Sequence, residues 1–412
     1  MTDRNVFHDP SGRRRRWLLR SAAVLGGFGI VVSAVFVLSL VFLPAFPPTP
    51  AVPEAVRHAL APGIPRIVPR ELRMRRFLLG RARQTLLRQI TSEERLRAKS
   101  LPTAPPAGGM VVAFYATWQE TGLHSLRANA GSITHLMPAW LTLTADGSGL
   151  DYRDWDPALT PHNLEVVSIA KGHHIQIWPV LSNAQKRVFD TERAHRLLHS
   201  DDTQDQLISE LRDWLKARDF QGVNVDLEAL SDADLPQVPR FLARMKAAFA
   251  PAGLGVSCDI QSTNDQLDWK SLSAPCDFVI IEGYDEHAMV DAPGPISDMS
   301  WFRAQLNRAV KQVPPNKLVL GLGNYAYDWT EGGKEAEPLT YLEAVLRARD
   351  RRQGEAPDSV VNFDPAALNP TYNYEDDDGK EHEVWMLDGV TAGNQLHLAH
   401  ALGVRQYALW VL

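Results

Sequence analysis

Three polar side chains alternate with apolar ones in residues 221–228, whose sequence is QGVNVDLE. Asn224, Asp226 and Glu228 stand two residues apart, so in a β-strand all three point to the same face. Burying two neighbouring carboxylates on an apolar strand costs free energy, and enzymes use this cost to raise the pKa of one carboxyl and keep it as an acid. Spacing alone leaves two interpretations open. The carboxylates could be a functional pair, or they could be solvated residues at a strand end or polar filler in a barrel.

The segments around this strand predict an α/β fold. Short apolar stretches bounded by turn residues predict eight strands, and helical stretches fall between them. The strands are expected at 110–116, 133–143, 174–181, 220–227, 254–260, 277–282, 317–323 and 405–411, and the helices at 163–171, 205–218, 236–250, 301–312 and 391–402. Eight strands with helical crossovers predict a (β/α)8 TIM barrel over residues 110–412. Residues 331–388 are too many for one crossover and predict a small α+β insertion after the seventh strand.

In such a barrel the active site lies where the carboxyl ends of the strands meet. Asp226 and Glu228 end the fourth strand, and aromatic and amide side chains end several others. The expected substrate contacts are Tyr115, Asn183, Asn224, Gln261, Tyr284, Asp285, Asn324 and Trp410. Aromatic rings stack on sugar rings, and amides and carboxylates bind hydroxyl and acetamido groups, so the set predicts a carbohydrate site. Each aromatic residue taken alone is equally consistent with core packing.

Composition limits the alternatives. Residues 1–99 carry 18 Lys+Arg against 6 Asp+Glu, whereas the remaining chain carries 25 against 43. An acidic globular part repels phosphates, which argues against a nucleic-acid ligand. The two cysteines, Cys258 and Cys276, exclude a disulfide framework; two buried free thiols are expected, although a pair on neighbouring strands stays open. The sequence contains no zinc motif and no glycine-rich phosphate loop, so no metal and no cofactor are expected.

The N-terminal region predicts a membrane anchor. Residues 1–20 form a basic tail, and residues 21–46 contain 26 consecutive uncharged, mostly apolar residues. A bilayer core needs about 20 such residues, so a single transmembrane helix is favoured over a cleaved signal peptide. The arginine block before it predicts a cytoplasmic N-terminus and an extracytoplasmic barrel at the inner membrane. Residues 47–109 read as a proline-rich linker with a basic helix, and because 57–99 carry 12 Lys+Arg, the basic bias lies on both sides of the span.

Several of these motifs resemble one family. QGVNVDLE is similar to the DGxDxDxE signature of glycoside hydrolase family 18, the chitinase-like barrels. The residues GYD at 283–285 resemble that family's sixth-strand motif, and YALW, ending in Trp410, resembles its last strand. Residues 381–396 resemble the tail of the cell-wall-active branch, whose members act on N-acetylglucosamine in peptidoglycan-type polymers. The resemblance covers residues 110–412.

This resemblance implies roles for four residues. Glu228 matches the general acid, and Asp226 matches the carboxylate that steadies the substrate's acetamido group, whose oxygen is the nucleophile in this family. Tyr284 matches the residue that hydrogen-bonds the acetamide, and Trp410 matches the platform under the distorted sugar.

Three positions depart from the pattern: Gln221 and Asn224 replace aspartates of the signature, and Ser182–Asn183 replace a Gly-Gly ending. The cell-wall-active branch also has Asn at the position of Asn224, so this change does not indicate inactivation. Because Asn224 adds no negative charge, Asp226 is expected to ionise more easily than in the usual pair.

The expected function is a membrane-anchored glycosidase (chitinase- or N-acetylglucosaminidase-like) that cleaves β-linked N-acetylglucosamine polysaccharide with retention. The alternative is a non-catalytic glycan-binding barrel, against which the presence of Glu228 argues. The chain ends two residues after Trp410, and it resembles the front of longer bacterial chains with polysaccharide deacetylase and glycosyltransferase modules. In that setting the barrel would trim or bind a growing exopolysaccharide.

Overall fold

The computed structural model describes residues 109–412 except 120, 186–187 and 352–360. The basic tail (1–20), the membrane helix (21–46) and, apart from residue 109, the linker with its basic helix (47–109) lie outside the described residues. Within the described part, no helix combines the length and apolarity needed to cross a bilayer.

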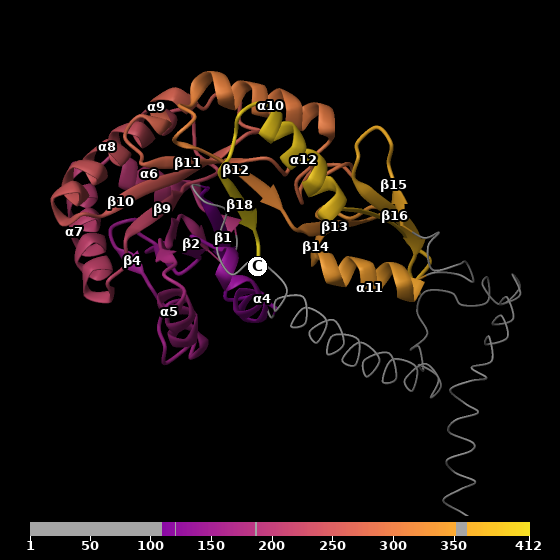
Figure 1. Ribbon diagram of the computed structural model, residues 1–412, viewed down its shortest axis with the longest axis horizontal. Helices are drawn as coiled ribbons and strands as arrows, with labels where there is room; N and C mark the ends of the chain where they lie inside the picture. Colours follow the sequence, from indigo (N-terminus) through magenta and orange to yellow (C-terminus); the bar gives the residue numbers. More distant parts are fainter. Residues whose placement is uncertain (1–108, 120, 186–187, 352–360) are drawn as a thin grey trace, which may run out of the picture. The chain divides into compact units, whose positions relative to one another are not determined.

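Eight parallel strand positions form a barrel, as the sequence predicted (Figure 1). The second position consists of two short strands, β2 and β3, and the third position of β5 and β6. The barrel closes between these two positions because β2 pairs with β5 and β3 pairs with β6. Pro179, which has no N–H to donate, lies in the break of the third position. The barrel strands are β1 (Val111–Tyr115), β2 (His135–Pro138) with β3 (Leu141–Leu143), β5 (Gln176–Ile177) with β6 (Val180–Ser182), β9 (Gly222–Asp226), β10 (Gly255–Gln261), β11 (Phe278–Glu282), β12 (Leu318–Gly323) and β18 (Tyr407–Trp410). The short β4 (Leu150–Asp151) pairs with β3 in the antiparallel sense, and β7 (Ala184–Gln185) pairs with β8 (Val188–Phe189).

Helices connect the strands and cover the outside of the barrel (Figure 1). The five helices predicted from the sequence are present, with their ends shifted by a few residues. The short α4, α6 and α9 were not predicted. The helices are α4 (Gly122–Asn129), α5 (His162–Gly172), α6 (Thr191–Leu198), α7 (Asp201–Arg218), α8 (Val238–Phe249), α9 (Trp269–Ser273), α10 (Met299–Gln312) and α12 (Gly389–Ala401), with 3-10 turns at Ala130–Ser132, Leu235–Gln237 and Ala250–Ala252.

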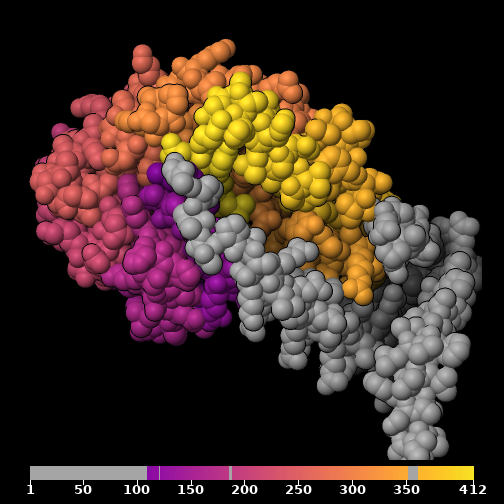
Figure 2. Space-filling model, viewed as in Figure 1, coloured from indigo at the N-terminus to yellow at the C-terminus, as the bar shows by residue number. Residues whose placement is uncertain are grey.

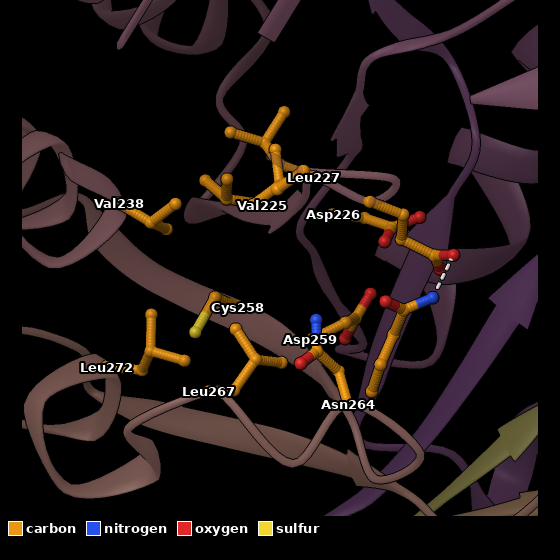
Figure 3. A pocket seen from close by; sticks show the side chains of 12 residues that line it. Val225, Asp226, Leu227, Val238, Cys258, Asp259, Asn264, Leu267 and Leu272 are labelled. Atoms are coloured by element: carbon orange, nitrogen blue, oxygen red, sulfur yellow. Dashed lines mark hydrogen bonds between the residues drawn. The ribbon is translucent and has the colours of Figure 1, made fainter. Parts of the chain in front are cut away.

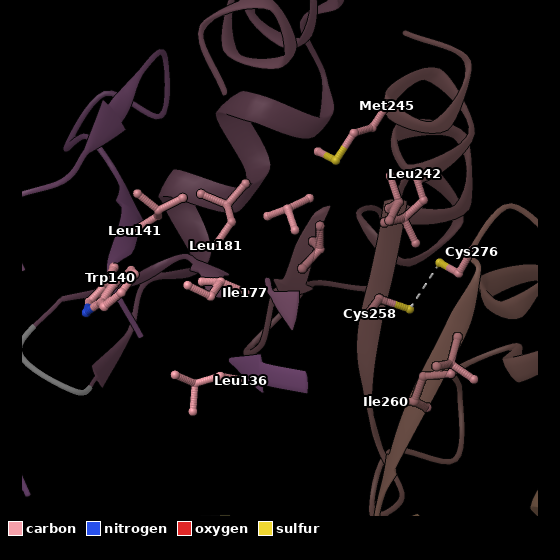
Figure 4. Packing of buried hydrophobic residues seen from close by; sticks show 14 of the residues in the cluster. Leu136, Trp140, Leu141, Ile177, Leu181, Leu242, Met245, Cys258, Ile260 and Cys276 are labelled. Carbon is pink, nitrogen blue, oxygen red and sulfur yellow. Dashed lines mark hydrogen bonds between the residues drawn. The ribbon is translucent and has the colours of Figure 1, made fainter. Parts of the chain in front are cut away.

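Strand alternation divides the apolar residues between two cores. Val223, Val225 and Cys258 point outward and pack with the helices. Figure 4 shows Cys258 in this outer core, beside Cys276. Phe114 and Phe278 point inward and fill the barrel. The sulfur atoms of Cys258 and Cys276 lie 3.7 Å apart, and both thiols are buried and free, as expected.

The expected α+β insertion follows β12 and begins at Tyr325 rather than near residue 331. Its antiparallel sheet has the order β14-β13-β17-β16-β15, and α11 packs on it. Within the insertion, the side chain of Asp328 is buried and accepts hydrogen bonds from Arg347 and Tyr374. In Figure 2 the insertion, in orange and yellow, forms one side of the visible face. Its elements are β13 (Tyr325–Thr330), β14 (Glu337–Thr340), α11 (Tyr341–Arg351), β15 (Asn362–Phe363), β16 (Pro370–Glu375) and β17 (Glu381–Met386).

Candidate active site

Asp226 and Glu228 lie where the fourth barrel strand ends. Since Val223 and Val225 face the helices, Asn224 and Asp226 face the barrel interior. Asp226 and Glu228 are partly exposed and line a pocket with Asp259, Gln261 and an apolar wall that includes Leu267 (Figure 3). The Nε2 atom of Gln261 donates a hydrogen bond to Oε2 of Glu228. The structure therefore brings the two predicted carboxylates and Gln261 together.

The protein around these carboxylates favours their protonated forms. Burial raises the pKa of Asp226 to about 7, although a hydrogen bond with Glu228 acts in the opposite direction. Burial also raises the pKa of Glu228 well above its usual value, and the negative charges of Asp226 and Glu282 raise it further. A glutamic acid that keeps its proton near neutral pH is suited to donate it to a leaving oxygen.

Asn224 does not contact the pocket, which corrects its prediction as a substrate-binding residue. Its side chain is fully buried, where it accepts a hydrogen bond from Ser257 Oγ (2.8 Å) and donates one to Asp259 Oδ2 (2.6 Å). Burial raises the pKa of Asp226 above its ordinary value, so the expectation that it ionises more easily than in the usual pair stays a prediction. The hydrogen bond from Asn224 thus leads to a carboxyl group on the neighbouring strand, that of Asp259 on β10.

Asn183 also lies beneath the site rather than in it. Its side chain is fully buried, and its amide pairs with the backbone of Glu228. The N–H of Glu228 donates to Oδ1 of Asn183 (3.0 Å), and Nδ2 of Asn183 donates to the carbonyl of Glu228 (2.9 Å). The buried side chain of Asn183 therefore holds the backbone of Glu228 and does not line the pocket.

Tyr115 faces the helices outside the barrel rather than the barrel interior, where the substrate contacts were expected. It belongs to the outer core with Leu126 of α4, whereas its neighbour Phe114 faces the barrel interior. The strand alternates sides at every residue, and both neighbours are aromatic, so the apolar pattern could not tell which one faces inward.

The sixth strand carries a second group of acids and tyrosines. Tyr284 is buried, and Gly321 on β12 leaves room for it, because a Cβ at that glycine would lie 3.3 Å from Tyr284 Cε1. Asp285 has a left-handed backbone (φ 61°), and its Oδ1 accepts hydrogen bonds from the hydroxyls of Tyr325 and Tyr327 (3.1 Å for Tyr327). Burial raises the pKa of Asp285 to about 6, against the effect of the two tyrosine hydrogen bonds.

Trp410 ends the last strand, β18, and packs against the residues that fill the barrel interior. Its ring meets Phe114 edge to face, with centroids 5.2 Å apart, and it packs against the group of residues that contains Tyr284. The peptide bond after Trp410 is cis. Asn324 is exposed, and its backbone N–H donates to the carbonyl of Trp410 (2.7 Å), so its contact with substrate stays a prediction.

Sequence reasoning missed two acids and one tyrosine of the site. Asp259 and Glu282 occupy inward positions of β10 and β11, and burial together with neighbouring carboxylates raises the pKa of each well above its usual value. Strict alternation along these strands would have found both. Tyr327 belongs to the insertion and reaches Asp285 from 42 residues away, which no local pattern indicates.

A (β/α)8 barrel with two carboxyl groups of raised pKa at the end of its fourth strand and a tryptophan on its last strand fits the class of glycoside hydrolase barrels. A profile described as "Glycosyl hydrolases family 18" matches residues 110–391. The chain belongs to this family, as the motifs predicted.

Individual relatives are about a quarter identical to this chain over the aligned residues. The uncharacterized glycosylase YvbX of Bacillus subtilis is 26% identical over 258 residues, which cover 59% of this chain and 73% of that protein. The cortical fragment-lytic enzyme of the same species is 23% identical over 258 residues, covering 60% of this chain and 58% of the enzyme. The chain therefore spans little more than half the length of that enzyme.

Solved structures show the same fold. The spore cortex-lytic enzyme SleL of Bacillus cereus superposes with a TM-score of 0.63 at 23% identity, covering 74% of this chain and 70% of that chain. A chitinase from Chromobacterium violaceum superposes with a TM-score of 0.64 at 24% identity, covering 74% and 94%. At these identities the likeness concerns the fold alone.

Proposed function

We propose that this protein is a retaining glycosidase that cleaves β-linked N-acetylglucosamine-containing polysaccharide by substrate-assisted catalysis. The observation that carries this proposal is the inward-facing pair of Asp226 and Glu228, in which burial and a neighbouring negative charge favour the protonated form of Glu228. Family membership supports it, because the family includes chitinases and cortex-lytic enzymes among the relatives of this chain.

The residues suggest an order of events. Glu228 gives its proton to the glycosidic oxygen while the substrate's own acetamido oxygen attacks the anomeric carbon and displaces that oxygen. Asp226 accepts a hydrogen bond from the acetamide N–H and stabilises the positive charge of the oxazolinium ion. Glu228, now a carboxylate, takes a proton from a water molecule. The water oxygen attacks the anomeric carbon, which opens the oxazolinium ring and restores the original configuration of the sugar. Tyr284 holds the acetamide, and Trp410 supports the sugar ring.

The cellular setting belongs to the same proposal. Residues 21–46 anchor the protein as a single-pass helix in the inner membrane, and the barrel works on the extracytoplasmic side. The substrate is a peptidoglycan-type polymer or, as a second candidate, a growing exopolysaccharide that deacetylase and glycosyltransferase modules handle.

The direct test replaces the acid without changing its shape. Glu228→Gln should abolish turnover of an N-acetylglucosamine oligomer while binding persists, because the amide keeps the hydrogen bonds but cannot release a proton. A matched control is Glu331→Gln, a change at an exposed residue outside the pocket. Equal turnover by wild type and Glu228→Gln contradicts the acid assignment. Binding by the wild type without any turnover supports a glycan-binding barrel instead.

The acetamide requirement is tested with the substrate. Oligomers of defined acetylation should be cleaved only where the sugar on the non-reducing side of the scissile bond keeps its acetyl group, since that group supplies the nucleophile. Cleavage after a deacetylated sugar contradicts substrate assistance.

A further inference from the structure

A group of three potential metal ligands lies outside the carboxylate pocket. His195 lies in the last turn of α6, and His199, four residues later, is the C-cap residue that follows this helix. Nδ1 of His195 lies 2.7 Å, and Nε2 of His199 2.9 Å, from the same atom, Oδ1 of Asp234. One ligand atom from each residue can be chosen so that all three lie within 4.8 Å of one another.

The carboxylate of this group is held in a fixed orientation. Asp234 is fully buried in the segment between β9 and α8. Its second oxygen, Oδ2, accepts hydrogen bonds from the backbone N–H (3.1 Å) and the hydroxyl (2.6 Å) of Ser231. Metal-binding carboxylates are commonly oriented by such outer hydrogen bonds, which leave the first oxygen directed at the ion.

The two imidazoles leave access from solvent. The side chains of His195 and His199 are 45% and 36% exposed, so an ion with its remaining water ligands can approach from the outside. The N-terminal end of α6 is capped separately by Asp190, which accepts hydrogen bonds from the N–H groups of Glu192 and Arg193. Two imidazole nitrogens thus converge on one buried carboxylate oxygen at the C-terminal end of α6.

We propose that His195, His199 and Asp234 bind a divalent transition-metal ion of the Zn²⁺ class, with water completing the coordination. Two imidazole nitrogens and one carboxylate oxygen suit Zn²⁺, whereas Ca²⁺ and Mg²⁺ favour sets of oxygen ligands. The third ligand lies 35 residues from His199, which explains why the sequence showed no zinc motif. This site is independent of the proposed glycosidase reaction, and the ion takes no part in it.

The position of the site gives the ion a structural task. The hydroxyl of Thr191, the first residue of α6, donates to the carbonyl of Ala229, the residue after Glu228 (2.6 Å). A metal bound by α6 and Asp234 would fasten the same two segments a second time. Binding should therefore stabilise the segment that follows the acid.

The test measures metal binding directly. Purified full-length chain without a polyhistidine tag is stripped with a chelator, dialysed against Zn²⁺ and analysed by elemental mass spectrometry; Co²⁺ then serves as a spectroscopic probe. We expect about one Zn²⁺ per chain and visible Co²⁺ absorption bands typical of low coordination number. Asp234→Asn and the double variant His195→Ala/His199→Ala should lose both signals, and Ser231→Ala should weaken Zn²⁺ binding by about 10–100-fold.

The control replaces two other helical histidines. His397→Ala/His400→Ala changes exposed residues of α12 and should leave stoichiometry and affinity unchanged. Asp234→Asn keeps the size and polarity of the side chain, so we expect this variant to fold. Its circular dichroism spectrum checks that it does. Zn²⁺ binding that is absent in the wild type, or equal in the wild type and the folded Asp234→Asn variant, overturns the proposal, whatever the glycosidase activity.

Discussion

The side-chain amide of Asn183 makes two hydrogen bonds with the backbone of Glu228, one to its N–H and one to its carbonyl, as the backbone of a neighbouring strand would. Glu228 N–H donates to Asn183 Oδ1 at 3.0 Å, and Asn183 Nδ2 donates back to the carbonyl of Glu228 at 2.9 Å. Glu228 lies two residues beyond the end of β9, so ladder hydrogen bonds of that strand no longer hold it. One buried side chain from the third strand position therefore fixes the backbone from which the proposed acid projects.

Asn183→Ala should lower kcat by roughly 100-fold with a smaller change in KM, because a small displacement of the acid affects the transition state more than substrate binding. The variant should also lose about 1–3 kcal/mol in the free energy of unfolding for each backbone group of Glu228 that is left buried and unpaired. Steady-state kinetics and urea unfolding measure the two effects. Asn129→Ala, which removes one exposed hydrogen bond to Ser125, is the control. Reduced stability with unchanged kcat would show that Asn183 has only a structural role.

The fold was predictable because its signals are local. Apolar runs and turn residues indicated all eight strand positions, and the long stretch after the seventh strand indicated the insertion. The grouping of Asp226 and Glu228 with Gln261 was predictable from the signature and from the end of the fifth strand. Phe114 and Tyr115 are both apolar, so strand alternation could not be assigned a direction, and the burial of Asn183 and Asn224 depends on partners on other strands. The contact of Tyr327 with Asp285 exists because a separate sheet folds back over the barrel.

The raised pKa of Asp226 predicts a pH-dependent stability. The ordinary value is 3.8 and the folded value is about 7, so the folded state binds more protons than the unfolded state between these values. The contribution of Asp226 to stability is thus fully present below about pH 3.8 and is lost as the pH rises through about 7. Asp226→Asn removes this dependence, so the variant should gain stability relative to the wild type between pH 5 and pH 8.

Urea unfolding at several pH values measures this difference. Asp350→Asn, at an exposed position of α11, is the matched control and should follow the wild type at every pH. A constant difference between Asp226→Asn and the wild type across the range would mean that Asp226 has an ordinary pKa in the folded protein.

The pairing of Asn224 with Asp259 leads to an exchange experiment. Oδ2 of Asp259 accepts a hydrogen bond from Asn224, whereas Oδ1 is buried and has no hydrogen-bond partner within the described part of the chain. Burial, followed by the charges of Asp226 and Glu282, raises the pKa of Asp259 well above its usual value. We expect Asp259 to hold the proton that the family's signature assigns to a carboxyl at position 224, and so to tune the charge of Asp226 during the reaction.

Asp259→Asn should therefore lower kcat by about 10–100-fold, in the range of a lost proton-transfer contribution. The double variant Asn224→Asp/Asp259→Asn keeps one amide and one carboxyl in contact but returns the carboxyl to the fourth strand. It should recover most of the lost kcat, which a double-mutant cycle reports as a favourable coupling between the two positions. If the double variant is no more active than Asp259→Asn, the carboxyl is needed on β10 itself, and the idea that Asp259 substitutes for a displaced signature residue fails. Full activity of Asp259→Asn would instead mean that a neutral hydrogen-bonding group at residue 259 is sufficient.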